Sequence, residues 1–250
     1  MQIKTLKAII IIALVLLTPI KTHAQEKNSA EKNSIRLNSA QIKSIDVPEV
    51  KSKQIITDGM FDQGEWDGAL CYSVAENYDF YIMADSEILY IGLKSAKPVG
   101  ELVCEVRITS DDKQVFLLHV SGALGEGVSG FPSTTKFDLN NNQYWEANFL
   151  KPDPLKQKAW IAAGKPIENY DDVYNKRDGV EFKIYRKKFT GSTLKFTIGW
   201  VRVEIEGKKP QINSFNFPEN AGLQNPDNWI ELNLPFFHVP NEMHNLAKHL

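Results

Sequence analysis

The stretch Ile56 to Trp66, ITDGMFDQGEW, gathers carboxylates around a turn dipeptide and ends on a tryptophan. Asp58, Asp62 and Glu65 supply hard oxygen ligands of the kind that calcium prefers. The pattern is also explained without an ion, because Asp-Gly can end a strand in a turn and Trp66 can anchor the next turn onto a core. A calcium site and a purely architectural role are therefore both open at this stretch.

A second chemical signal is the pairing of arginine with glutamate on two expected strands. Glu105 and Arg107 alternate with aliphatic residues in ELVCEVRIT, and Arg202 and Glu204 do so in LKFTIGWVRVEIEG. Because successive side chains of a strand point to opposite faces, each pair shares one face. Such a face is explained either by cross-strand charge pairs on a solvated surface or by a polar surface that holds a hydroxyl-rich ligand.

Motifs of the common hydrolases are missing from the sequence. It contains no Gly-x-Ser-x-Gly and no His-Glu-x-x-His. The acid pairs Asp111-Asp112 and Asp171-Asp172 lie in turn-like segments, where acids are common for backbone reasons. We therefore predict a non-catalytic protein.

The elements that must position these side chains are short strands. Runs rich in β-branched and aromatic residues, bounded by turn residues, cover segments 71–76, 79–85, 87–95, 101–112, 113–122, 158–165, 179–189 and 194–207. Residues 107–120 read as a hairpin, and short helical turns are expected near 62–69 and 241–250. The pattern predicts an all-β protein, an antiparallel β-sandwich of jelly-roll or immunoglobulin-like type.

The N-terminus has the composition of a secretory signal peptide. Lys4 and Lys7 precede an apolar run that ends near Ile20, and Ala24 closes the segment. We predict a signal peptide at 1–24, a flexible polar spacer at 25–43, one β-sandwich domain at 44–240 and a C-terminal tail at 241–250. The mature chain is then exported, periplasmic or extracellular, and without a membrane segment; an uncleaved anchor is the alternative.

The net charge bears on the class of binding partner, and the cysteine content bears on disulfide formation. The net charge of −2 gives no electrostatic support for binding nucleic acid. Cys71 and Cys104 are the two cysteines, and in an oxidising compartment they either pair or remain buried thiols.

The order of the motifs resembles carbohydrate-binding modules of family 9 and their relatives, which are DOMON-like β-sandwiches. ITDGMFDQGEW resembles the first strand and turn, and YDFYIMADSEILYIGLKS resembles the paired strands that follow. ELVCEVRITSDD, GVEFKIYRKKF, LKFTIGWVRVE and NPDNWIELNL are similar to later strands, so the resemblance spans residues 45–236. Tyr185 departs from it, because the family usually has proline there.

The resemblance implies a protein that binds a sugar or polysaccharide fragment by aromatic stacking and polar contacts, often with structural calcium. In that family two tryptophans sandwich the terminal sugar. The candidates here are Trp145, its neighbour Tyr144, and Trp160, of which Trp145 has a polar, Asn-rich context that favours exposure. Polar contacts would come from Glu105, Arg107 and Arg202. The partners are then a carbohydrate and a glycan-degrading enzyme or surface complex.

Two alternatives on the same sandwich remain open. A related branch of the fold binds haem through axial ligands such as Met and His, for which Met60, Met83 and His119 are the candidates. The domain would then transfer electrons. The other alternative is a periplasmic domain that binds a protein partner.

Overall fold

The computed structural model describes residues 41–51, 55–99, 102–111, 114–130, 136–139, 143–148, 153–164, 173, 175, 177–206, 209–222 and 225–235. All of them belong to the larger of two units into which the chain divides, Ser34–Leu250. The predicted signal peptide, the spacer up to residue 40 and the tail at 241–250 lie outside the described residues. Ile42, at the end of the predicted spacer, packs against the hydrophobic core.

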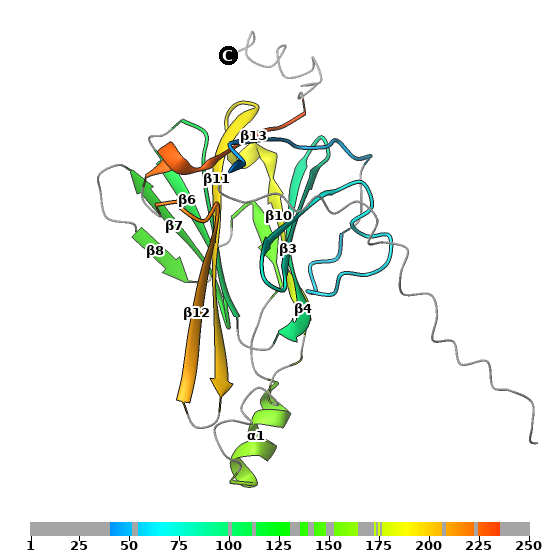
Figure 1. Ribbon diagram of the computed structural model, residues 1–250, viewed down its shortest axis with the longest axis vertical. Helices are drawn as coiled ribbons and strands as arrows, with labels where there is room; N and C mark the ends of the chain where they lie inside the picture. The colour runs from blue at the N-terminus through cyan, green and yellow to red at the C-terminus, as the bar shows by residue number, and fades with distance from the viewer. Residues whose placement is uncertain are drawn as a thin grey trace, which may run out of the picture. The chain divides into compact units, whose positions relative to one another are not determined.

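The strands form two sheets, which confirms the expected all-β sandwich (Figure 1). Sheet A consists, in spatial order, of β1 (Ser44–Asp46), β13 (Ile230–Asn233), β11 (Thr193–Glu206), β5 (Leu102–Thr109), β6 (Gln114–Val120), β7 (Leu124–Gly130) and β8 (Lys136–Leu139), with β12 (Lys209–Phe217) also paired to β11. Sheet B consists of β2 (Leu70–Ala75), β3 (Tyr78–Ala84), β4 (Ile88–Val99), β10 (Arg177–Tyr185) and β9 (Trp145–Ala147). Neighbouring strands are antiparallel except for β1 and β13, which are parallel.

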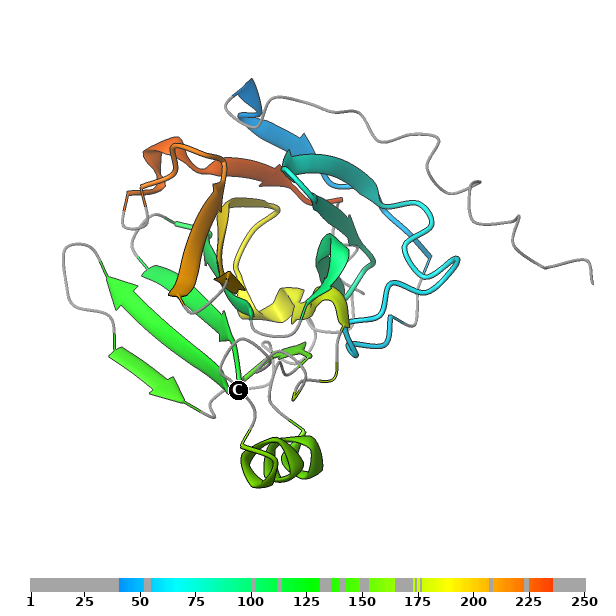
Figure 2. The same ribbon diagram turned by 60° about the horizontal axis from the view of Figure 1, so that its bottom comes forward.

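The core lies between the inner faces of the two sheets (Figure 2). On β5 the alternate residues Cys104, Val106 and Ile108 are fully buried and belong to the core cluster. Sheet B contributes Phe80 and Phe182 to the same cluster. Burying each such side chain stabilises the fold by about 1.5–3 kcal/mol, so the period of two along the strands decides which face of each sheet becomes its inner face.

The outer face of sheet B is covered by residues 55–69. Trp66 is 8 % exposed and packs with Ile55, Met83 and Tyr90 in a second hydrophobic cluster. Gly92 on β4 leaves room for this cover, because a Cβ there would lie 2.9 Å from the Trp66 ring. Trp66 therefore has the architectural role that its position after the Asp-Gly turn suggested.

One helix replaces an expected strand. Residues 158–165 were expected to be extended, but Pro154–Ala162 form helix α1. The side chain of Asp153 accepts hydrogen bonds from the backbone N–H groups of Leu155 and Lys156, and Pro154 occupies the first turn, which together start a helix. No helix among the described residues has the length and apolarity needed to cross a membrane.

The two cysteines are separate free thiols. Cys71 is on β2 of sheet B, and Cys104 is buried on β5 of sheet A. The disulfide that the sequence left open is therefore not formed.

Candidate functional site

The connection between β12 and β13 is anchored on the outer face of sheet A by Trp229. The Trp229 ring is 5 % exposed and packs with Val115 of β6 and with Ala221. Its indole N–H donates a 2.8 Å hydrogen bond to the carbonyl oxygen of Gly222. Just before it, Asn225 caps the 3-10 helix η4 (Pro226–Asn228) by accepting a hydrogen bond from the N–H of Asp227.

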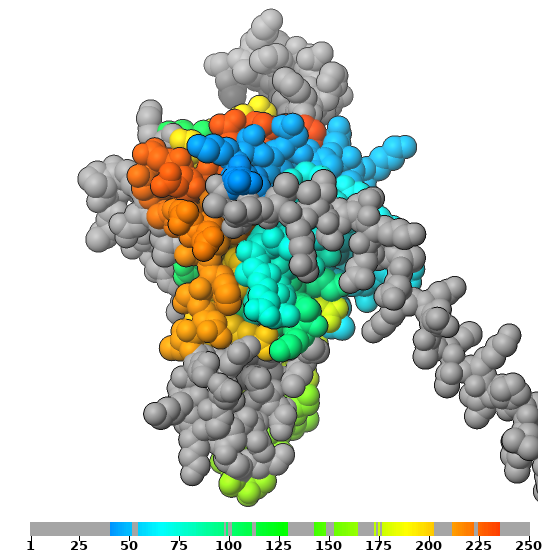
Figure 3. Space-filling model, viewed as in Figure 1, coloured from blue at the N-terminus to red at the C-terminus, as the bar shows by residue number. Residues whose placement is uncertain are grey.

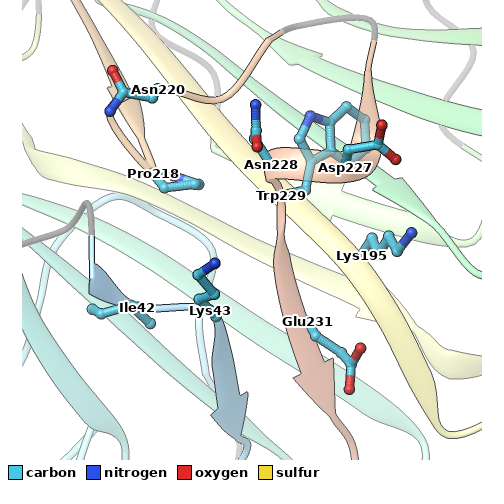
Figure 4. A pocket seen from close by; sticks show the side chains of 9 residues that line it. All are labelled: Ile42, Lys43, Lys195, Pro218, Asn220, Asp227, Asn228, Trp229 and Glu231. Atoms are coloured by element: carbon cyan, nitrogen blue, oxygen red, sulfur yellow. The ribbon is translucent and has the colours of Figure 1, made fainter.

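A pocket of about 350 Å³ lies beside this connection, at the edge of sheet A (Figure 4). Its volume falls within the range of about 300–1,000 Å³ that is usual for small-molecule sites. The lining residues come from three separate parts of the chain: Ile42, Lys43, Lys195, Pro218, Asn220, Asp227, Asn228, Trp229 and Glu231. In Figure 3 the blue segment that contains β1 and the orange-red segment that contains β13 lie side by side at the surface.

The pocket is polar and its formal charge is balanced. Lys43 and Lys195 provide ammonium donors, Asp227 and Glu231 provide carboxylate acceptors, and two asparagines add amides that donate and accept. In Figure 4, Lys43 and Asn220 are seen on one side of β13, and Lys195 and Glu231 on the other. Such a lining suits a neutral ligand rich in hydroxyl groups, because each hydroxyl both donates and accepts.

A chain of hydrogen-bonded side chains occupies the same outer face on β5 and β6; we call it the polar array. Oγ of Ser121 lies 3.0 Å from Nε2 of His119, and Nδ1 of His119 lies 3.1 Å from Oε1 of Glu105. The other carboxylate oxygen, Oε2, accepts a 2.6 Å hydrogen bond from Arg107. The pKa of Glu105 is held below its usual value, chiefly by the hydrogen bond from His119 and further by the Arg107 charge.

Strand register creates the polar array. Glu105 of β5 is directly opposite His119 of β6, and Gly199 of β11 is opposite Glu105 on its other side. A Cβ at Gly199 would lie 2.7 Å from Oδ1 of Asn216, so glycine allows the Asn216 amide to lie over this part of the sheet. Glu105 and Arg107 are therefore on one polar outer face, and they form an ion pair within one strand.

Trp145 does not have the exposed position that was expected. It is 1 % exposed, it stacks on Phe182, and its indole N–H donates a 2.9 Å hydrogen bond to the buried carboxylate of Glu126. Lys188 forms a 2.7 Å ion pair with the same carboxylate. The interpretation of Trp145 as a sugar-stacking ring is thus wrong, because the core covers it.

The other two predicted aromatic residues lie elsewhere. Tyr144 is 42 % exposed, at the start of β9 in sheet B, with the Lys187 ammonium 4.4 Å from its ring centroid. Trp160 is half-buried in α1. Neither residue lines the pocket, and neither is on the strands that carry the polar array.

Arg202 is on the opposite face of sheet A from Glu105 and Arg107. Its register partner is Leu102, and it alternates with Val201, which pairs with Val103. Arg202 therefore shares the inner side of β11 with Trp200, directly opposite the core residue Leu102. The expectation that it belongs to one polar face with Glu105 and Arg107 is wrong.

The acids of the opening stretch hold its backbone. Glu65 accepts hydrogen bonds from the N–H groups of Ile56 and Asp62, at 2.7 and 3.3 Å, and Asp58 accepts one from Met60 at 2.8 Å. Among the described residues, which include all of 55–69, no three Asp, Glu, His or Cys side chains are grouped to hold a metal ion. Backbone N–H groups thus occupy the carboxylates of Glu65 and Asp58, and the calcium site at Asp58, Asp62 and Glu65 stays a prediction.

The haem candidates are on different faces of the sandwich. Met83 is fully buried under residues 55–69 on the outer side of sheet B, and Met60 belongs to that covering segment. His119 is on the outer side of sheet A, within the polar array. The hydrophobic core separates His119 from both methionines, so neither pair could bind one iron from its two sides.

The sequence reasoning missed the pocket. Its residues are far apart in the chain, and only NPDNW carried a usable signal, since turn formers precede a tryptophan. From the sequence His119 was a candidate only as a haem ligand, and Ser121 was not a candidate for any role.

Comparison with known proteins gives two solved structures of similar fold. No family model and no curated protein matches the sequence. A carbohydrate-binding module of family 9 from Caldicellulosiruptor kristjanssonii, solved in complex with cellotriose, is 14 % identical, with a TM-score of 0.43, over 80 % of this chain and 96 % of that chain. A candidate carbohydrate-binding protein from Bacteroides uniformis is 12 % identical, with a TM-score of 0.40, over 78 % of this chain and 100 % of that one.

Proposed function

We propose that the protein binds a neutral carbohydrate in the pocket between β1, β13 and the connection that follows β12, and leaves the glycosidic bonds of the ligand intact. The observation that carries the proposal is the pocket itself: about 350 Å³, with lysine, carboxylate and amide groups of balanced charge around one tryptophan. The ordered motifs that resemble family 9 modules point to the same ligand class.

The pocket residues have distinct expected roles. Glu231 and Asp227 accept hydrogen bonds from sugar hydroxyls, and Lys43 and Lys195 donate to them. Trp229 is too covered to stack a sugar on its ring face, so it serves as a rigid wall. Among the described residues no other aromatic ring lines the pocket, so binding there would rest on polar contacts; the exposed Tyr144 is beside sheet B and could stack only a sugar bound elsewhere.

The proposal includes where the protein binds its ligand and which partner it serves. The leader-like N-terminus supports export, so the ligand would be a glycan met outside the cytoplasm. A partner enzyme that degrades the same glycan would give a non-catalytic binding protein its use.

The test is a glycan array probed with the purified protein, followed by titration calorimetry on any glycan that binds. Glu231→Gln and Lys195→Met remove one acceptor and one donor from the pocket. Each variant should weaken binding about 10-fold or more, because a polar group of the ligand loses its partner. Glu219→Gln is the matched control, since Glu219 is exposed and does not line the pocket.

The outcomes separate cleanly. Binding that is lost in both pocket variants and kept in the control supports the site. Binding unchanged in both variants moves the sugar away from this pocket. A blank array from folded protein overturns the function, and release of reducing ends from a bound glycan overturns its non-catalytic character.

A further inference from the structure

Three members of the polar array have the connectivity of an acyl-transfer triad. Such a triad needs a hydroxyl at Nε2 of a histidine and a carboxylate at its Nδ1. Ser121 Oγ lies 3.0 Å from Nε2 of His119, and Oε1 of Glu105 lies 3.1 Å from Nδ1. Both distances are within the hydrogen-bond range in which a base activates a nucleophile.

The fold produces this arrangement from a short sequence pattern. His119 is on the outer face of β6, and Ser121 directly follows the last residue of that strand, with its Oγ 3.0 Å from Nε2 of His119. The antiparallel register then sets Glu105 opposite His119. The three side chains therefore lie on a rigid sheet and its adjoining turn, which favours precise positioning.

Each side chain in the array is held for its role. Arg107 binds the second oxygen of Glu105 at 2.6 Å and fixes the orientation of the carboxylate. The ionised Glu105, whose pKa is lowered mainly by His119, accepts a hydrogen bond from Nδ1–H, and in this tautomer the Nε2 lone pair points toward the serine. The Ser121 hydroxyl also lies 3.4 Å from the carbonyl oxygen of Ala123, and the shorter distance to Nε2 favours donation to histidine.

The array is covered enough to stay ordered and open enough to be reached. The side chains of Arg107, His119 and Glu105 are 13 %, 18 % and 30 % exposed. Ser121 itself is half-buried, at the first position of the turn that joins β6 to β7. This partial exposure is more compatible with a small acyl group than with a bulky one.

We infer that Ser121, His119 and Glu105 form a nucleophilic site that hydrolyses small acyl esters, such as an acetyl ester of an alcohol or a sugar hydroxyl. Binding in the pocket needs no nucleophile, so this is a second activity on the same face of sheet A, and it does not depend on the proposed function. It leaves glycosidic bonds untouched.

The steps balance as an ester hydrolysis. Oγ of Ser121 attacks the carbonyl carbon while its proton passes to Nε2 of His119, and the carbonyl oxygen becomes an oxyanion. In the resting structure the backbone N–H of Ala123 donates a 3.3 Å hydrogen bond to Oγ of Ser121; it would have to turn from Oγ to the carbonyl oxygen to stabilise the oxyanion. Collapse expels the alcohol, which takes the proton from Nε2. A water molecule then gives a proton to Nε2 and attacks the carbonyl carbon of the acyl-enzyme. The bond from that carbon to Oγ breaks, the acid leaves, and Nε2 returns the proton to Oγ of Ser121.

The experiment uses the purified full chain with 4-nitrophenyl acetate and a fluorophosphonate probe. A burst of nitrophenolate and labelling that peptide mass mapping places on Ser121 are expected. Ser121→Ala should abolish the burst and labelling, and His119→Gln should slow turnover by about 100-fold or more. Ser214→Ala is the matched control, since Ser214 is an exposed serine of β12, on the outer face of sheet A and outside the polar array.

Thermal unfolding of each variant separates lost chemistry from lost folding. Glu105→Gln is a second variant: it keeps the shape of the side chain, and it should slow the burst while the protein stays folded. Folded wild-type protein without a burst or label overturns the inference, as does a burst that persists in Ser121→Ala. Glycan binding measured on the same variants reports separately on the pocket.

Discussion

The indole N–H of Trp66 donates a 3.0 Å hydrogen bond to the fully buried carboxylate of Glu181, and the N–H of Gly59 donates a 2.8 Å bond to the other oxygen. The two bonds join the covering segment 55–69 to β10 of sheet B. Burial of the carboxylate has a larger effect on the pKa of Glu181 than the two hydrogen bonds, which lower it. Together with the nearby negative charges of Glu65 and Asp58, burial raises the pKa of Glu181 to about 8.

This relationship predicts a pH dependence of stability. Because the folded-state pKa of Glu181 is above the ordinary value of about 4.5, its contribution is fully present below pH 4.5 and is lost as the pH rises to about 8. The free energy of unfolding should fall across that window by up to roughly 5 kcal/mol from this group. In Glu181→Gln the fall should be smaller. Urea unfolding at a series of pH values measures it; parallel curves for both proteins would contradict the assignment.

Gly92→Ala should loosen the cover of sheet B. A Cβ at Gly92 would lie 2.8 Å from the Phe61 ring and 2.9 Å from the Trp66 ring, so both rings must shift. We expect the free energy of unfolding to fall by about 1–3 kcal/mol, as for overpacking in other cores. The control is Gly222→Ala, where the nearest atom to the new Cβ is 3.9 Å away. Equal unfolding midpoints for the two variants would show that the cover adapts without strain.

Trp145→Phe and Tyr144→Ala distinguish an aromatic residue that stabilises the core from one that is available at the surface for a ligand. Trp145→Phe removes the donor to the buried Glu126 carboxylate and should cost about 1–3 kcal/mol of stability. It should leave the glycan affinity of the folded protein unchanged. Tyr144→Ala should change stability by less than about 0.5 kcal/mol, because the side chain is largely exposed. Titration calorimetry reads affinity; a loss of binding in Tyr144→Ala would locate the stacking ring there.

Glu65→Gln tests whether the opening stretch needs an ion. The carboxylate accepts backbone hydrogen bonds from Ile56 and Asp62, so its loss should lower the unfolding temperature equally in chelator and in excess calcium. Thermal unfolding of both proteins in both buffers checks this. If calcium stabilises wild-type protein and fails to stabilise the variant, these oxygens bind the ion after all.

Local pattern predicted much of the fold. Alternation in ELVCEVRIT predicted that Cys104 and Val106 face away from Glu105 and Arg107, and the structure has them so. The register of β5 and β6 likewise confirms the predicted hairpin. Side-chain alternation is fixed by strand geometry within one segment, so it needs no knowledge of neighbours.

Residues 158–165 show where a local pattern misleads. Their apolar run suits a strand or a helix, and the signals that decided for a helix, Asp153 and Pro154, lie just before it. The same capping rules, applied one turn earlier in the chain, would have found α1.

The sequence by itself determined the sheet class and the alternating faces, because each depends on residues a few positions apart; the architectural role of Trp66 needed the structure, which shows its burial against Met83 and Tyr90. Tertiary structure alone decided that Trp145 is buried, that Arg202 is on the inner side, and that Lys43, Lys195 and Glu231 share a pocket. Tertiary structure also placed Glu105 of β5 directly opposite His119 of β6. These outcomes follow from which strands pair and in what register, and that choice is made by burial across the whole sandwich rather than by any one segment.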